Sequence, residues 1–128
     1  MGKQLRGKGE VNYDYKHDIL FFKTSEREYL KSIELDNVVL DLDKEDFLVV
    51  IQIFEASKFL KIKKKDLLLI PLWEYSASIN PIENGARIDF RLTFQIKIRN
   101  KIIEKNPIIL ENIRENLPSS KLVCVATA

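Results

Sequence analysis

Four acidic side chains lie within six residues of the stretch VVLDLDKEDFLVVIQIFEAS (38–57), at Asp41, Asp43, Glu45 and Asp46. Carboxylate oxygens are the ligands that Ca²⁺ and Mg²⁺ prefer. Asp41 and Asp43 lie two residues apart in an alternating stretch, so they project from one face of a predicted strand, about 6–7 Å apart. A site for a hydrated divalent cation is therefore one hypothesis.

A charged hairpin turn is the other interpretation, and we favour it. A calcium loop needs six to eight oxygen ligands and a glycine at its sharp turn, whereas residues 41–50 contain no glycine. An aspartate in a turn accepts hydrogen bonds from its own backbone, and charges at a hairpin tip oppose edge aggregation. The metal hypothesis names four candidate ligands, Asp14, Asp18, Asp41 and Asp43. No cofactor is expected.

A second set of candidates is basic. The residues considered for contact with nucleic-acid phosphates are Lys61, Lys63, Lys64, Lys65, Arg91, Lys97 and Arg99. Such contacts would make binding depend on salt. The polar face of the predicted strand 86–99 carries no aromatic side chain on which a base could stack. A solvated surface is therefore the favoured interpretation, and an accessory nucleic-acid-binding module that uses the basic second half is the alternative.

Catalysis has little support in the sequence. His17 is the only histidine and lies in a predicted turn, Cys124 lies in an apolar strand and is expected in the core, and Ser119 and Ser120 have no activating partner. The chain contains no phosphate-binding loop, dinucleotide-binding turn or zinc-ligand spacing. We therefore expect no catalytic residues and no enzymatic activity.

Composition indicates one soluble domain. The chain has 128 residues, of which 45% are hydrophobic and 31% charged, as is usual for a globular protein that buries its own core. Its apolar runs are shorter than the roughly 20 residues of a membrane helix, and its single cysteine fits the reducing cytoplasm. Residues 1–57 carry 8 basic and 12 acidic side chains, and residues 58–128 carry 13 and 7. This split indicates surfaces suited to association.

Alternation of period two predicts an α+β fold that is mainly antiparallel sheet. The expected elements are listed by range: a meander of strands near 11–14, 18–24, 28–35, 38–43 and 47–54, short helices near 55–69, a hairpin of 75–82 and 86–99, a helix near 107–117 and a closing strand at 122–127. Residues 1–10 are expected to form a flexible basic arm. Residues 11–128 are expected to form one globular domain in two halves, 11–70 and 71–128.

Residues 11–70 resemble an uncharacterised prokaryotic family, the domain of unknown function 2283 (DUF2283). The resemblance is carried by Tyr13-Asp14, Asp18 with Leu20 and Phe22, the run VLDLD (39–43), the run IQIFEAS (51–57) and Asp66-Leu67-Leu68. The family usually has glycine where Glu45 or Asp46 and Val50 stand, and glutamate in place of Gln52. The resemblance implies a small β-meander followed by helix, with no assigned activity, and it does not cover residues 71–128.

The sequence as a whole predicts a small cytoplasmic protein with a binding or homo-oligomeric assembly role. Association is expected through strand edges and the acidic–basic split, with Phe47–Phe54 or Ile88–Ile98 as the apolar face. Trp73 is expected to anchor the two halves to each other. A second copy of the chain is thus the first expected partner, nucleic acid is the alternative, and a membrane is not expected.

Overall fold

The computed structural model describes residues 3–127, and in these residues nearly all of the regular structure is one ten-stranded mixed sheet. The strands are β1 (Lys3–Asp14), β2 (Ile19–Thr24), β3 (Lys31–Glu34), β4 (Val38–Leu42), β5 (Leu48–Phe54), β6 (Leu72–Ile82), β7 (Gly85–Ile98), β8 (Lys101–Lys105), β9 (Ile108–Ile113) and β10 (Ser120–Thr127). Two short helices, α1 (Ala56–Leu60) and α2 (Lys64–Leu67), join β5 to β6. The expectation of an α+β fold with a mainly antiparallel sheet is confirmed at this level.

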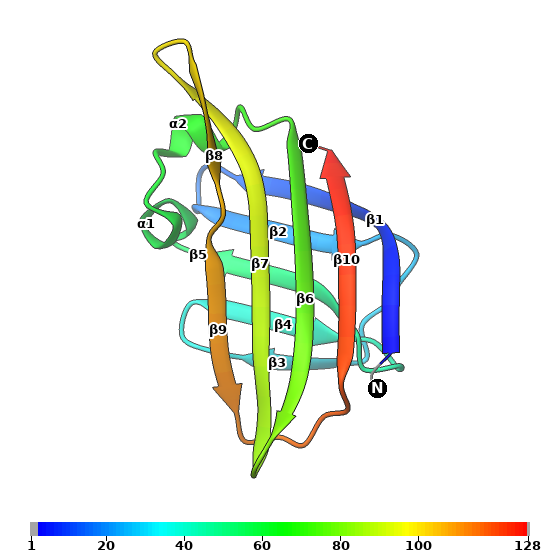
Figure 1. Ribbon diagram of the computed structural model, residues 1–128. Coiled ribbons are helices and arrows are strands. Elements are labelled where there is room, and N and C mark those ends of the chain that lie inside the picture. The colour runs from blue at the N-terminus through cyan, green and yellow to red at the C-terminus, as the bar shows by residue number, and fades with distance from the viewer. Residues whose placement is uncertain (1–2, 128) are drawn as a thin grey trace.

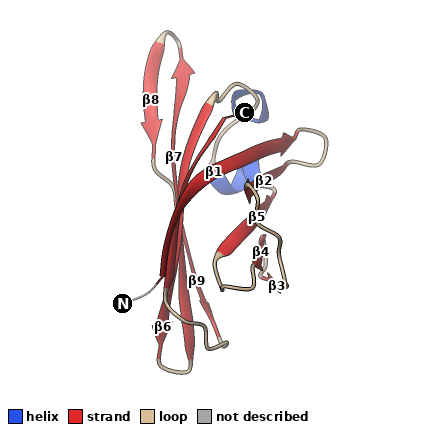
Figure 2. Cartoon of the chain, turned by 90° about the vertical axis from the view of Figure 1, so that its right-hand side faces the viewer, coloured by secondary structure: helices blue, strands red, loops and turns tan. Residues whose placement is uncertain are grey.

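The sheet runs in the order β3-β4-β5-β2-β1-β10-β6-β7-β8, and β9 also pairs with β7. It folds over on itself into two layers, with β10, β6, β7, β8 and β9 in front of β2, β5, β4 and β3, whose strands run across them (Figures 1 and 2). Strand β1 belongs to both layers, because residues 3–10 pair in parallel with β10 and residues 9–14 pair antiparallel with β2. A strand that bends from one layer to the other is the usual corner of such a crossed packing.

The back layer has a Greek-key order where the sequence predicted a simple meander. Strand β2 pairs with β5, whereas β3, β4 and β5 follow one another as hairpins. The connection 25–30 therefore crosses the ends of β5 and β4 to reach the edge strand β3. Two backbone bonds hold it there, from Ser25 N to Lys8 O at 2.9 Å and from Leu30 N to Leu42 O at 2.7 Å. The order of strands in the sequence did not predict this pairing, because either β3 or β5 could supply the backbone hydrogen bonds that β2 needs on that side.

Two further expectations about secondary structure are corrected. The basic segment 1–10 was expected to be a flexible arm, but residues 3–10 form the part of β1 that pairs with β10; residues 1 and 2 lie outside the described part of the chain. The helix expected near 107–117 is instead strand β9, which pairs with the β7 residues 86–91. In both cases the partner strand offers backbone hydrogen bonds, and that pairing outweighs a local pattern.

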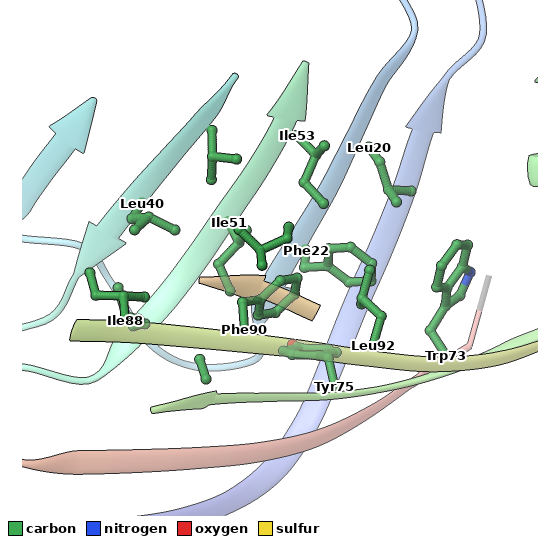
Figure 3. Close-up of a cluster of buried hydrophobic side chains, with 14 of the residues drawn as sticks. Leu20, Phe22, Leu40, Ile51, Ile53, Trp73, Tyr75, Ile88, Phe90 and Leu92 are labelled. Atoms are coloured by element: carbon green, nitrogen blue, oxygen red, sulfur yellow. The ribbon is translucent and has the colours of Figure 1, made fainter. Parts of the chain in front are cut away.

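The core lies between the two layers and is centred on Phe22 of β2 (Figure 3). Its ring centroid lies 5.5 Å from that of Trp73, 5.0 Å from that of Tyr75 and 5.6 Å from that of Phe90. Edge-to-face and tilted aromatic pairs of this kind add about 0.5–1.5 kcal/mol each beyond the area they bury. Trp73 is 1% exposed, so its expected role as an anchor between the two halves is confirmed.

Strand β7 shows the alternation that the sequence predicted. Ile88, Phe90, Leu92, Phe94 and Ile96 are buried on its inner face. The inner face loses its cover beyond that point, because the β7–β8 hairpin extends past the rest of the body (Figure 2).

Within residues 3–127, no helix combines the length and apolar character needed to cross a membrane.

Gly9 marks the point at which β1 passes from one layer to the other. A Cβ atom at Gly9 would lie 2.7 Å from Cε1 and 2.8 Å from Cζ of Tyr75, closer than side chains pack in proteins. The Tyr75 ring is buried among Phe22 and Phe90, and its hydroxyl donates to the Lys23 carbonyl at 3.3 Å. The corner of the sheet therefore requires a residue without a side chain at this position.

We expect Gly9→Ala to lower the free energy of unfolding by about 1–3 kcal/mol, because the added methyl group overpacks the Tyr75 ring. Gly7→Ala is the matched control in the same strand, since a Cβ there would meet only the Thr24 methyl group at 3.9 Å. Urea denaturation followed by tryptophan fluorescence measures both variants. Equal losses in the two variants would contradict this account of the corner.

Candidate functional site

The acidic cluster forms the turn between β4 and β5. Oδ1 of Asp43 accepts hydrogen bonds from the backbone amides of Glu45 at 2.9 Å and Phe47 at 3.0 Å, and Asp46 adopts a left-handed conformation with φ 65°. Asp43 is 4% exposed, and its other carboxylate oxygen accepts from Arg27 at 2.9 Å. The carboxylate thus organises its own turn, which supports the favoured interpretation of this stretch.

Arg27 connects the turn to the crossing segment 25–30. Its guanidinium donates to Asp43 and to Glu45, at 2.9 and 3.1 Å, and lies 5.5 Å from the centre of the Phe47 ring. Burial acts to lower the pKa of Arg27, but the hydrogen bond and charge of Asp43 and the charge of Glu45 raise it above its ordinary value. The guanidinium therefore holds the Greek-key connection against the β4–β5 turn.

A hollow of about 950 Å³ lies beside this turn, between β1 and the crossing segment. Its charged lining consists of Arg6, Lys8, Arg27 and Lys44 on the basic side and Glu26, Glu28, Asp43 and Glu45 on the acidic side. Arg27 is already bound by two of these carboxylates. Because the charges balance, the hollow favours neither an anionic nor a cationic ligand.

Asp18 joins the β1–β2 turn to the start of α1. Its carboxylate accepts hydrogen bonds from the Tyr13 hydroxyl at 2.6 Å, the Ser57 amide at 3.0 Å and the Ser57 hydroxyl at 2.6 Å. Its own carbonyl accepts from the amide of Ala56 at 3.0 Å. Burial acts to raise the pKa of Asp18, but the bonds from Ser57 and Tyr13 outweigh burial and lower it. Burial, together with the hydrogen bond to Asp18, raises the pKa of Tyr13.

The four candidate metal ligands are not brought together. Asp43 binds Arg27, Asp18 binds Tyr13 and Ser57, Asp41 accepts from the Ser32 hydroxyl, and Asp14 accepts from the ring and backbone amide of His17. The bonds from His17 lower the pKa of Asp14. Within residues 3–127 no group of three or more His, Cys, Asp or Glu side chains is arranged as a metal site.

The remaining polar candidates, His17, Cys124 and Ser120, each contact a neighbouring polar group of the fold. His17 is exposed in the β1–β2 turn, as predicted, and contacts only Asp14 among the hydrogen-bond partners in the described chain. Cys124 is buried beside the Thr24 hydroxyl, with 3.7 Å between sulfur and oxygen. Ser120 donates to the Asp46 carbonyl at 3.1 Å and so ties β10 to the β4–β5 turn. His17 is thus paired with one carboxylate in an exposed turn, while Cys124 and Ser120 contact a hydroxyl and a backbone carbonyl.

The basic candidates fall into two separate places. Residues 61–65 lie at the α1–α2 segment, where Lys64 donates to the Tyr15 carbonyl at 3.3 Å and lies 5.3 Å from the centre of its ring. Arg91 lies on the outer face of β7, and Lys97 and Arg99 belong to the projecting β7–β8 hairpin (Figure 1). The seven residues therefore do not form one surface.

The edge formed by β8 and β9 is a feature that sequence reasoning missed. The pairs Gln95–Glu104 and Arg91–Ile108 keep the same register with β7, and Leu92 N donates to Pro107 O at 3.0 Å between them. Residues 101–113 thus form one continuous strand beside β7. In the described sheet this strand is an edge. The signal in the sequence was its content of β-branched isoleucine, which favours strand, whereas the Asn106-Pro107 pair indicated a helix start.

Three large apolar side chains on the outer face of this edge are exposed. Ile102 is 70% exposed, Ile108 49% and Leu110 58%. All three lie on the outer face of the front layer, because they pair with the outward residues Lys97, Arg91 and Asp89 of β7. Open strand edges with exposed apolar side chains are where a sheet accepts a further strand.

Residues 10–57 match the family described as "Protein of unknown function (DUF2283)". A Methanosarcina mazei protein that carries the name "Putative hypoxanthine phosphoribosyltransferase" is 33% identical to the chain over 111 residues, which are 87% of each protein. Residues 10–57 belong to the DUF2283 family. An uncharacterised protein of Methanocaldococcus jannaschii is 34% identical over 61 residues, 48% of this chain and 53% of that protein. No solved structure matches significantly.

The DUF2283 segment corresponds to a definite part of the fold. Residues 10–57 run from the second half of β1 through β2, β3, β4 and β5 to the start of α1, so they contain the whole back layer. The residues that carried the resemblance meet in two structural contacts, Asp18 with Tyr13 and Ser57, and Asp43 with its own turn. In this chain these polar residues thus hold the back layer together.

We expect Asp18→Asn to lower the free energy of unfolding at neutral pH by about 1.5–3 kcal/mol, because charge-assisted hydrogen bonds are lost at a buried site. The folded pKa of Asp18 is lowered, so its contribution is present above the unfolded pKa, near 4, and is lost as the pH falls through the folded value. The gap between wild type and variant should therefore narrow below about pH 4.

Urea unfolding at several pH values measures this gap. Asp36→Asn is the control, because Asp36 is an exposed aspartate in the β3–β4 turn. A constant difference between wild type and Asp18→Asn across the acid range would contradict the assigned role of the carboxylate.

Proposed function

We propose that this DUF2283 protein is a non-enzymatic assembly module that associates with a second copy of itself through the β8–β9 edge. The observation that carries the proposal is the continuous strand 101–113, which has no partner on its outer side within the described sheet. The exposed side chains of Ile102, Ile108 and Leu110 line it. Pairing with a second strand would satisfy its free backbone groups and cover this apolar surface.

The other end of the sheet supports the choice of this edge. Strand β3 is four residues long and its side chains at Lys31, Ser32 and Glu34 are exposed and polar. Lys31 also forms an ion pair with Glu115, from the segment that follows β9. A short, charged edge of this kind resists pairing with another chain. The apolar face for association is therefore supplied by β8 and β9, rather than by Phe47–Phe54 or Ile88–Ile98, most of whose apolar side chains are buried.

The name carried by the Methanosarcina mazei relative implies a phosphoribosyl-transfer activity on hypoxanthine. We leave that activity with the relative. The features that support our proposal are surface features of the front layer, and none of them contributes to such a reaction. The carboxylates that could act in a reaction, such as those of Asp18 and Asp43, accept hydrogen bonds from neighbouring side chains and amides.

We expect the wild-type protein to form a dimer in solution and Ile108→Lys to raise the dissociation constant at least about tenfold, because a charged side chain replaces an apolar one that pairing would cover. Val125→Lys is a matched control, since Val125 is 48% exposed and Ile108 49%, but Val125 lies on the interior strand β10. Sedimentation equilibrium over a range of concentrations measures both. A monomeric wild type, or equal weakening by the two variants, would contradict the proposal.

A second candidate function, nucleic-acid binding, is favoured by the β7–β8 hairpin. The hairpin extends beyond the body of the protein (Figure 2), and its turn is made by Arg99 and Asn100, with φ 51° and 65°. Lys97, Lys101 and Lys105 flank this turn, and Glu104 is the one acidic residue of the range 95–105. A projecting basic hairpin can follow a groove of a duplex and neutralise its phosphates.

The double variant Lys97→Gln with Lys101→Gln should weaken binding of a fluorescent mixed-sequence duplex and reduce the slope of log K against log salt by about two. Fluorescence anisotropy at several salt concentrations provides the measurement. Lys61→Gln with Lys63→Gln is the control, because it removes the same charge from the α1–α2 segment. Absence of binding by the wild type, or the same loss in both double variants, would contradict a role for the hairpin.

A further inference from the structure

We propose that the two copies pair antiparallel about a two-fold axis at Ile108, so that Lys105 of each copy lies opposite Glu111 of the other. The inference rests on the assembly function proposed above and specifies its geometry. It follows from three properties of residues 101–113: the direction of their backbone groups, the face of each side chain and the position of each charge.

The backbone direction leaves the outer edge open. In an antiparallel pair, alternate residues direct their N–H and C=O groups toward the neighbouring strand. The bond from Leu92 N to Pro107 O shows that odd-numbered residues of β8–β9 face β7. The backbone N–H and C=O groups of the even-numbered residues from 102 to 112 therefore point away from β7, toward the open side of the edge. Proline usually protects an edge because it lacks an N–H. The nitrogen of Pro107, however, points toward β7, so its lack of an N–H does not prevent pairing on the open side of the strand.

The face of each side chain limits the registers. Antiparallel pairing of two identical edges in one continuous sheet requires a two-fold axis perpendicular to the sheet. Paired residues then project to the same face, so an even-numbered residue always meets an even-numbered one. The two-fold axis must consequently lie midway between one residue and its own copy on the other strand. It cannot lie at the level of the bond between two successive residues.

The charges select one of these positions. With the axis at Ile108, Lys105 meets Glu111 twice, Ile103 meets Ile113, and Glu104 meets Asn112. Between residues of β8 and β9, this register leaves no charged side chain opposite an apolar one; its one such pair, Ile102 with Arg114, involves the residue just beyond the end of β9. Opposite charges directly across an antiparallel pair are favourable.

Neighbouring axis positions are less favourable. An axis at Pro107 places Glu111 opposite Ile103, and an axis at Ile109 places Lys105 opposite Ile113. An axis at Asn106 does pair Glu111 with Lys101, but it places Glu104 opposite Ile108. Charged residues opposite apolar ones lose solvation without gaining a partner.

Charge exchange tests the register. Lys105→Glu alone and Glu111→Lys alone should each raise the dimer dissociation constant about three- to tenfold, because like charges then face each other twice. The double variant Lys105→Glu with Glu111→Lys should return it to the wild-type value. The control double variant, Lys101→Glu with Glu111→Lys, should not. Sedimentation equilibrium gives the constants, and thermal melting of each variant checks that it folds.

A distance measurement is independent of these energies. A nitroxide attached to Asn112→Cys should lie about 26 Å from its copy along the paired strands, because eight residues separate the two labels in this register. The axis at Asn106 would place them about 40 Å apart. Cys124 is 1% exposed, and unmodified wild type shows whether it takes up the label.

The outcomes separate the two proposals. A wild-type monomer overturns the assembly function itself. If the wild type is a dimer whose dissociation constant is unchanged by both single charge reversals, or whose labels lie at another distance, the register is wrong. The assembly function is not contradicted by that result.

Discussion

The packing of Phe22 against the aromatic residues of the front layer is the interaction on which the rest of the structure depends. Phe22 is fully buried and contacts Trp73, Tyr75 and Phe90, which come from β6 and β7. A ten-stranded sheet has two faces to bury, and folding it across itself covers one of them with a single core. The bend in β1, the absence of a side chain at Gly9 and the burial of Tyr75 all follow from that closure.

Most of the polar groups that look capable of chemistry serve this closure. Asp43 and Arg27 hold the Greek-key connection to the β4–β5 turn, and Asp18 holds the β1–β2 turn to α1. Within residues 3–127, every buried side-chain nitrogen and oxygen has a hydrogen-bond partner. Buried polar groups that are fully bonded in this way define one arrangement of the chain. In this fold, the charged turns are therefore part of the framework.

The family match and the proposed interface lie in different layers. The DUF2283 segment contains the back layer, whereas the open edge and the projecting hairpin belong to the front layer, from residues 72–127. The Methanosarcina mazei relative aligns over 87% of the chain, so that alignment extends into the front layer.

The sequence by itself determined the predominance of antiparallel sheet, the buried and exposed faces of β7, the charged turn at Asp43 and the exposed position of His17. Each depends on neighbours a few residues apart, through alternation or through an aspartate that binds its own backbone. Only the tertiary structure decided that residues 3–10 form a strand, that β2 pairs with β5 and that Ile108–Ile113 is a strand rather than a helix.

The reason is the same in all three cases. A backbone accepts any strand that offers hydrogen bonds in register, and the strand that does so can lie far away in sequence, as β10 does for β1. The β8–β9 edge was missed for this reason too. Its isoleucines and the Asn106-Pro107 pair are visible in the sequence, but that residues 101–113 would lie beside β7 with an open outer side depends on the assembled sheet.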